Sequence, residues 1–170
     1  EKIVSKALEL FNEKGIEYVG MRELAVILGI RVSNITYYFP TKDDLVNRIA
    51  LDLNKENSKI IIEYPDLTMH GFLDMIHQAF HNHTRYRCLF LSFVHYMTHN
   101  KAISEKYKQT QINRTTVMSA NLAKLRNEGY LKPSAESEID NMVSVITLIA
   151  RFWISEAAVT YRHLTSQEQI

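Results

Sequence analysis

The fold is decided by residues 21–40, which have the sequence MRELAVILGIRVSNITYYFP. Leu24 and Leu28 lie four residues apart, so they place apolar side chains on one face of a short helix. Gly29 follows at a position where a tight turn needs a positive φ, which glycine adopts at little cost. A further short helix comes next, and its Ile35 is expected to fill the angle between the two helices. The stretch therefore predicts a helix-turn-helix.

The sequence on either side extends this pair into a larger helical unit. The predicted helices of this part span residues 3–11, 21–28, 32–39 and about 41–62. Apolar side chains recur at intervals of three and four in the first of them, which should end at Gly15. Pro40 ends the third helix. Thr41 and Asp44 match a capping box and predict the start of the fourth helix.

The rest of the chain is also predicted to be helical. Helices are expected at residues 69–82, 85–99 and 102–127 and from about residue 134 onward. The last is apolar around most of its circumference, so we expect a second subunit to cover the excess. Thr165–Glu168 has the pattern of another capped helix start, and we expect a terminal helix to continue beyond Ile170. The predicted fold is all-α, with a three-helix head in residues 1–45 and a larger helical bundle in residues 46–170.

The composition of the 170-residue chain narrows the class of protein. Hydrophobic residues make up 46% and charged residues 23%, which excludes disordered and collagen-like chains. Five Gly and three Pro are too few for the turns of an all-β fold. The most apolar stretch, Val143–Ile154, contains Arg151 and falls short of the roughly 18 apolar residues of a membrane span. Cys88 is the single cysteine, which suits a reducing compartment and predicts a cytoplasmic protein.

The helix after Gly29 presents short polar groups, a methyl group and an aromatic ring on its exposed face. These residues are Val32, Ser33, Asn34, Thr36 and Tyr37. Such side chains bind phosphates and the edges of bases in a DNA groove. The stretch is therefore a candidate for sequence-specific DNA binding. The alternative is a packed helix pair without a ligand, which also occurs in unrelated folds.

Three segments resemble, in this order and spacing, the head of the TetR family of bacterial transcriptional repressors. They are ALELFNEKG (7–15), MRELAVILGI (21–30) and NITYYFPTKDDL (34–45). The resemblance implies a DNA-binding head. It also implies that the chain beyond about Val46 forms a helical core with an internal ligand cavity and a dimer interface made by the last helices.

The resemblance assigns roles to individual residues of the head. Lys42 and Tyr37 should contact phosphates, and Arg22 should lie near the DNA backbone. The residues implied to face the major groove are Val32, Ser33, Asn34 and Thr36. The sequence departs from the usual family pattern at Gly20, Arg31 and Thr36. Because Arg31 adds a positive charge close to a phosphate, we include it in the predicted interface together with Tyr38.

The net charge of the head is close to neutral. Residues 1–47 contain six Lys and Arg against seven Asp and Glu. Residues 21–42, however, carry three positive charges and one negative charge, which favours DNA at that face. Because the chain opens on Glu1 rather than Met, we expect residues to precede it, and a basic arm there would supply further charge.

The larger part of the chain offers many candidates for the cavity that the resemblance implies. The predicted ligand-binding residues are Phe72, Met75, Phe93, Tyr96, Met97, Met118 and Trp153, and Phe80, Phe90 and Met142 are also available. Side chains of these types indicate an apolar or aromatic small-molecule effector. The alternative is that these residues only fill the core.

Other kinds of site are not supported by the sequence. Two histidine pairs, His77 with His81 and His95 with His99, have the spacing of metal ligands. A closed zinc site needs about four ligands and no HExxH motif is present, so we predict neither metal nor cofactor. The sequence has no phosphate-binding Gly-rich loop and no triad signature, so we predict that the protein is not an enzyme. Cys88 lies in the apolar segment RCLFLSF and should be a buried structural thiol.

The function predicted from the sequence is that of a ligand-responsive transcriptional regulator, and we expect a repressor. Its partners would be a second copy of the chain, a small-molecule effector and a pseudo-palindromic operator of double-stranded DNA, with no membrane. The near-neutral head leaves one alternative open. That alternative is a helical dimer that binds a hydrophobic metabolite or a protein partner without useful DNA affinity.

Overall fold

The structure is a computed structural model that describes residues 1–62, 67–132 and 136–160. These residues form α-helices connected by short turns and contain no strand, which confirms the all-α prediction. The helices are α1 (Lys2–Lys14), α2 (Met21–Leu28), α3 (Val32–Thr36), α4 (Lys42–Ile62), α5 (Met69–Arg85), α6 (Arg87–Leu91), α7 (Phe93–His99), α8 (Lys101–Asn127) and α9 (Glu136–Thr160). The expected helix start at 165–168 lies outside the described residues.

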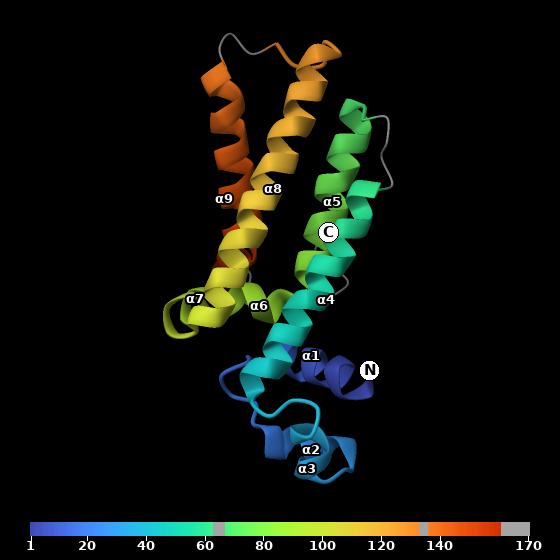
Figure 1. The fold of residues 1–170 in the computed structure, drawn as a ribbon, viewed down its shortest axis with the longest axis vertical. Coiled ribbons are helices and arrows are strands. Elements are labelled where there is room, and N and C mark those ends of the chain that lie inside the picture. The colour runs from blue at the N-terminus through green and yellow to red at the C-terminus, as the bar shows by residue number, and fades with distance from the viewer. Residues whose placement is uncertain (63–66, 133–135, 161–170) are drawn as a thin grey trace.

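Helices α1 to α3 form a small head at one end of an elongated molecule (Figure 1). The turn between α2 and α3 follows the prediction, because Gly29 has φ of 66° and lies in the left-handed region. Its neighbour Ile30 donates its backbone N–H to the carbonyl of Ala25 at 3.0 Å, which closes the end of α2. Ile35 is fully buried where α2 and α3 meet.

Helix α3 is shorter than predicted. It ends at Thr36 instead of continuing to Phe39. The amides of Tyr37 and Phe39 still bond to carbonyls four residues back, whereas the amide of Tyr38 bonds to Ile35, three residues back. The last residues therefore form a tighter turn before Pro40.

Helix α4 leads from the head into the larger bundle (Figure 1). The predicted capping box at its start is confirmed. The amide of Asp44 donates to Thr41 Oγ1 at 3.1 Å, and the amide of Thr41 donates to Asp44 Oδ2 at 2.9 Å. The Asp44 carboxylate also accepts a hydrogen bond from the Thr41 hydroxyl at 2.7 Å, and this bond, together with that from the Thr41 amide, lowers the pKa of the Asp44 carboxyl.

The prediction of one helix over residues 85–99 was wrong. The chain forms α6 and α7 instead, separated at Ser92, whose φ of −91° and ψ of 9° leave the helical region. The Ser92 hydroxyl donates to Glu17 Oε2 at 3.0 Å in the loop after α1. A contact to a residue 75 positions away holds this bend, so the local sequence pattern gave no sign of it.

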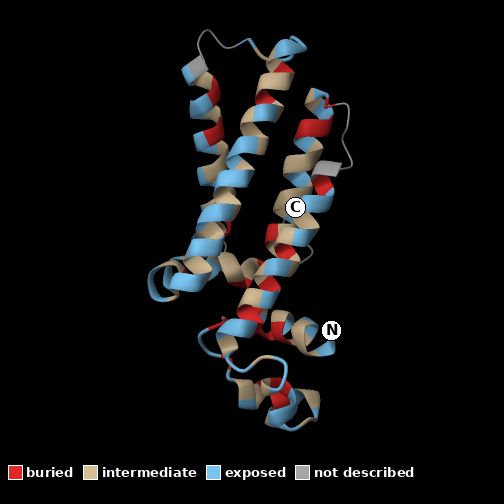
Figure 2. Ribbon diagram, in the orientation of Figure 1, coloured by how far each residue is buried: buried red, intermediate tan, exposed pale blue. Residues whose placement is uncertain are grey.

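Buried residues cluster at two places in the molecule (Figure 2). One cluster joins the head to α4, α6 and α7 and includes Phe11, Leu24, Ile49 and Tyr96. The other lies at the far end of the bundle and includes residues of α5, α8 and α9. The head is therefore packed onto the bundle by apolar contacts as well as joined to it through α4.

Helix α9 exposes a stripe of large apolar side chains. Its members are Val145, Leu148, Ile149, Phe152 and Val159. By length and composition alone, residues Ser137–Thr160 of this helix could cross a membrane, since an 18-residue segment of it has a mean hydropathy of 1.6. Only 11% of that segment is buried in the structure. A soluble monomer rarely exposes a continuous apolar stripe of this kind.

Candidate DNA-binding face and effector cavity

The predicted base-reading residues lie at the outer end of the head. Ser33 and Asn34 are exposed on the first turn of α3, whereas Val32 and Thr36 are half-buried. The hydroxyl of Thr36 is directed back toward the Ser33 carbonyl, at 3.4 Å. Ser33 and Asn34 are thus the side chains of α3 most accessible to the edges of bases.

Two tyrosines extend this face beyond the end of α3. Tyr37 and Tyr38 are 80% and 68% exposed, and their rings lie edge to face with centroids 5.0 Å apart. Rings that pack on each other while remaining exposed present a rigid surface with hydroxyl groups at its rim. Such a surface suits contacts with the DNA backbone.

Lys42 has contacts inside the head that the sequence did not indicate. Its Nζ donates to the carbonyl of Ile16 at 2.9 Å and to that of Glu17 at 3.3 Å, so it ties the start of α4 to the loop after α1. An ammonium group has three N–H donors. One donor is left for a phosphate, and Lys42 therefore combines a structural contact with the capacity for a DNA contact.

The charged residues around the predicted DNA-binding face favour DNA more than the near-neutral net charge of the head suggests. Arg22 and Arg31 are exposed. Glu23, the one acid in residues 21–42, bonds to Lys14 Nζ at 2.8 Å, and this hydrogen bond lowers the pKa of the Glu23 carboxyl. Asp43 accepts a hydrogen bond from Asn100 Nδ2 at 2.6 Å. These two acids are engaged within the protein.

Asn12 connects the head to the bundle at the junction of α5 and α6. Its Nδ2 donates to the Arg85 carbonyl at 2.7 Å, and its Oδ1 accepts from the Cys88 amide at 3.0 Å. One side chain on α1 thus satisfies both a carbonyl at the end of one helix and an amide at the start of the next. Asn12 therefore fixes α1 to the junction of α5 and α6.

A cavity of about 190 Å³ lies inside the larger bundle, lined by residues of α4 to α9. Of the predicted ligand-binding residues, Phe72, Met75, Phe93 and Met118 line it, together with Phe80 and Phe90. A second cavity of about 110 Å³ is lined by Tyr96 and Met97 and shares Phe90, Phe93, Tyr107 and Arg114 with the first.

Trp153 and Met142 do not line either cavity. Trp153 stacks behind Phe80 with ring centroids 5.3 Å apart, and Met142 packs in the far apolar cluster. The indole Nε1 of Trp153 lies 3.5 Å from Nδ1 of His83, which is buried against Phe90. Burial and the charge of Arg114 lower the pKa of His83 to about 3, so this histidine is neutral at physiological pH.

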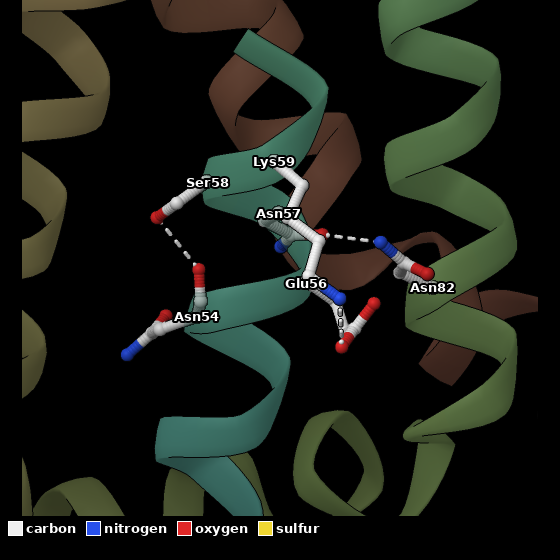
Figure 3. Close-up of polar contacts among 6 residues, drawn as sticks. All are labelled: Asn54, Glu56, Asn57, Ser58, Lys59 and Asn82. Carbon is white, nitrogen blue, oxygen red and sulfur yellow. Dashed lines mark hydrogen bonds and ion pairs between the residues drawn. The ribbon is translucent and has the colours of Figure 1, made fainter. Parts of the chain in front are cut away.

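The polar side chains of the main cavity were not singled out from the sequence. They are Asn57, Tyr107, Gln111, Arg114, Asn121, Thr147 and Arg151, and the neutral His83 also lines the cavity. Asn57 of α4, which lines the cavity, accepts a hydrogen bond at its Oδ1 from Asn82 of α5 at 2.9 Å (Figure 3). For Arg151 a signal was available, because it is a lone charge in the apolar run Val143–Ile154. Arg114 lies in a largely polar helix, where one more charge carries no signal.

The histidines of the segment from His70 to His99 are spread over different environments. His83 is buried, whereas His95 and His99 stack near the surface with centroids 4.6 Å apart. Within the part of the chain that the structure describes, no three His, Cys, Asp or Glu side chains lie close enough together to hold a metal ion.

Comparison with protein families assigns both parts of the chain. Residues 3–49 match the model of bacterial regulatory proteins of the tetR family, and residues 55–170 match the TetR model of a bacterial transcriptional repressor. The chain belongs to the TetR family of bacterial transcriptional regulators.

Two curated relatives match short segments of the chain. The HTH-type transcriptional regulator LuxR of Vibrio harveyi is 30% identical over 71 residues, which are 42% of this chain and 35% of that protein. The probable HTH-type transcriptional regulator YttP of Bacillus subtilis is 33% identical over 61 residues, 36% of this chain and 30% of that protein. The matched segments therefore cover about a third of each relative.

Solved structures of TetR-family regulators share the fold over nearly the whole chain. A regulator from Marinobacter aquaeolei VT8 has a TM-score of 0.87 at 21% identity, covering 94% of this chain and 80% of that one. PfmR from Thermus thermophilus has a TM-score of 0.65 at 17% identity, covering 95% of this chain and 94% of that one. At these identities the likeness supports the TetR fold alone.

Proposed function

We propose that the protein represses transcription by binding a pseudo-palindromic operator as a dimer, and that a small molecule in the bundle cavity releases it. The observation that carries this proposal is the family match of the head, combined with the exposed residues of its recognition helix α3. Two heads would enter successive major grooves on one side of the duplex, roughly 34 to 36 Å apart.

The exposed stripe of α9 supports the dimer. A copy of the same stripe would cover it in a two-fold interface. The substitution Leu148→Asp places a charge in this stripe and should yield monomers in sedimentation experiments. Leu73→Asp, on the exposed side of α5, is the matched control and should leave the dimer intact.

Helix α4 supports a mechanism for release. It carries residues of the head at one end and lines both cavities further along, at Asn54 and Asn57. A ligand that favours one tilt of α4 would change the separation of the two heads and prevent both from docking. A coupling of about 1 to 3 kcal/mol would change operator affinity roughly 5- to 150-fold.

The same argument assigns separate functions to the two parts of the chain. Residues 1–45 would bind DNA, and residues 46–170 would bind the effector and the second protomer. Since its target is the bacterial chromosome, the protein would act in the cytoplasm. The apolar lining of the cavity favours an effector with an apolar or aromatic body.

The experiment that tests the proposal is selection of bound duplexes from a randomised DNA pool by the full-length protein at two salt concentrations. A palindromic consensus whose binding weakens steeply with salt is expected, because DNA binding releases counterions. If the folded dimer enriches no sequence at low salt, the proposal fails, and a helical dimer that binds a metabolite or protein partner becomes the better account.

A further inference from the structure

Among the residues that the structure describes, the walls of the two cavities carry positive charge and no negative charge. Arg114 and Arg151 line the main cavity, and Arg114 and Lys106 line the second. No Asp or Glu is among the lining residues of either cavity, and no ion pair joins Arg114 or Arg151 to an acid within the described ranges. Two guanidinium groups thus face largely apolar space with no counter-charge from the described part of the chain.

We propose that the effector is an amphipathic anion, with an oxyanion head held by Arg114 and Arg151 and an apolar or aromatic body in the rest of the main cavity. This inference rests on the effector cavity of the proposed function and names the chemistry of its ligand. A carboxylate is the simplest head of this kind, because a guanidinium donates two parallel N–H bonds to its two oxygens.

Arg151 is the residue that most needs a partner. Its Nε is buried, and within the described residues it has no hydrogen-bond acceptor. Its guanidinium lies 5.9 Å from the ring centroid of Phe93 and 5.7 Å from that of Tyr107. The rings provide some attraction for the cation, but an unpaired buried donor still costs free energy. An anion beside Arg151 would remove this cost.

Arg114 faces the same space from α8 and is held by one neutral group. Its Nη2 donates to Asn54 Oδ1 at 2.8 Å. Burial, and to a smaller extent the charge of Arg151, lower the pKa of Arg114, so the two guanidinium groups repel each other within the cavity. An anion between them would turn this repulsion into attraction on both sides.

The neighbouring polar groups suit an anion as well. His83 is neutral and leaves the positive charge to the arginines. Tyr107, which lies beside Arg151, has its pKa raised by burial, so it keeps the phenolic proton that it would donate to an oxyanion.

The remaining walls determine the body of the ligand. They are formed by Phe72, Met75, Ile76, Phe80, Met118 and Ile146. Aromatic and thioether groups adapt to rings and to alkyl chains. The main cavity of about 190 Å³ and the adjoining one of about 110 Å³ together approach the lower end of the roughly 300 to 1,000 Å³ of ligand pockets. A compact ligand with one ring or a medium alkyl chain fits this space.

The experiment compares ligands that share a body and differ in the head. Phenylbutyrate, phenylbutanol and phenylbutylamine form one set, and octanoate, octanol and octylamine form the other. Trp153, the single tryptophan, reports binding by fluorescence because it stacks on the cavity residue Phe80. The carboxylates should bind at least about tenfold more tightly than the alcohols, and the amines more weakly than both.

Variants then test the assignment to the two arginines. Arg114→Met and Arg151→Met should each reduce the preference for carboxylate over alcohol several-fold, while the alcohols still bind. Arg151→Lys keeps a charge and should retain part of the preference, which covers the case in which Arg151→Met does not fold. Lys108→Met, on an exposed face of α8, is the matched control and should leave the preference unchanged.

The proposal is overturned if alcohols bind as tightly as carboxylates, or if the preference survives in Arg114→Met and Arg151→Met. It is equally overturned if no carboxylate binds below on the order of 1 mM. Its failure is distinguishable from that of the proposed function, because fluorescence binding needs no DNA and DNA selection needs no ligand. Selected operators without a carboxylate preference refute the anion alone, whereas a carboxylate preference without selected operators refutes the regulator.

Discussion

Lys42 provides a prediction in which a structural role and a DNA-binding role are separable. Replacement by Met removes the charge and both hydrogen bonds to the carbonyls of Ile16 and Glu17. Because these bonds are partly exposed, their loss should lower the free energy of unfolding by about 1 to 2 kcal/mol. If the remaining N–H group contacts a phosphate in each head, the slope of log affinity against log salt should also become shallower by about 1.8 for the dimer.

The two effects are measured by different assays. Urea unfolding gives the change in stability, and titration of a selected operator at four or more salt concentrations gives the slope. Lys59→Met, on the part of α4 far from the head, is the matched control and should leave the slope unchanged. If Lys42→Met lowers stability but the slope is the same as in the unmodified protein, Lys42 is a structural residue and its assignment to a phosphate is wrong.

Three further predictions follow from the described contacts. Asn34→Ala should relax the base preference at one position of each half-site and leave non-specific affinity nearly unchanged, whereas an equal loss on all sequences would contradict base reading. His83 has a pKa of about 3 when folded and about 6.5 when unfolded, so it costs stability as the pH falls from about 6.5 towards 3. In that range, His83→Phe should therefore reduce the slope of the free energy of unfolding against pH by up to about 1.4 kcal/mol per pH unit. Burial raises the pKa of Cys88 to about 12, so a thiol reagent should modify it at pH 8 only as fast as the protein opens, and rapid labelling of the folded protein would contradict this burial.

The features of the head that the sequence predicted are set by residues close together in the chain. The left-handed Gly29 and the capping pair Thr41 and Asp44 act within four residues, so their patterns are sufficient. The break at Ser92 depends on Glu17, which is 75 residues away. Pattern and propensity give no information about such a contact, and the run of apolar residues around it favoured one continuous helix.

The candidate site likewise has features that the local sequence predicts and features that depend on the tertiary structure. Exposed residues on the first turn of α3 follow from helical periodicity, and most of the apolar cavity residues follow from their type. The positive charge of the cavity does not, because it depends on how α8 and α9 are rotated. Arg114 would be a solvent-exposed residue if α8 were turned by half a rotation, and in a helix polar on most faces the sequence does not fix that rotation.

The rotation of α8 also suggests how an anion bound in the cavity would affect the position of the head. Three polar side chains spaced along the first half of α8 and its N-cap bond to α4: Asn100 to Asp43 at 2.6 Å, Lys106 to Asn47 at 3.3 Å and Arg114, midway along α8, to Asn54 at 2.8 Å. Each of these hydrogen bonds contributes little net free energy, whereas the apolar cluster beneath α4 is closely packed and resists local rearrangement. An anion that draws Arg114 away from Asn54 would therefore first break the hydrogen bond between α8 and α4 that lies nearest the main cavity. The tilt of α4, and with it the separation of the two heads, would then depend on whether the hydrogen bonds of Asn100 and Lys106 to α4 rearrange as well.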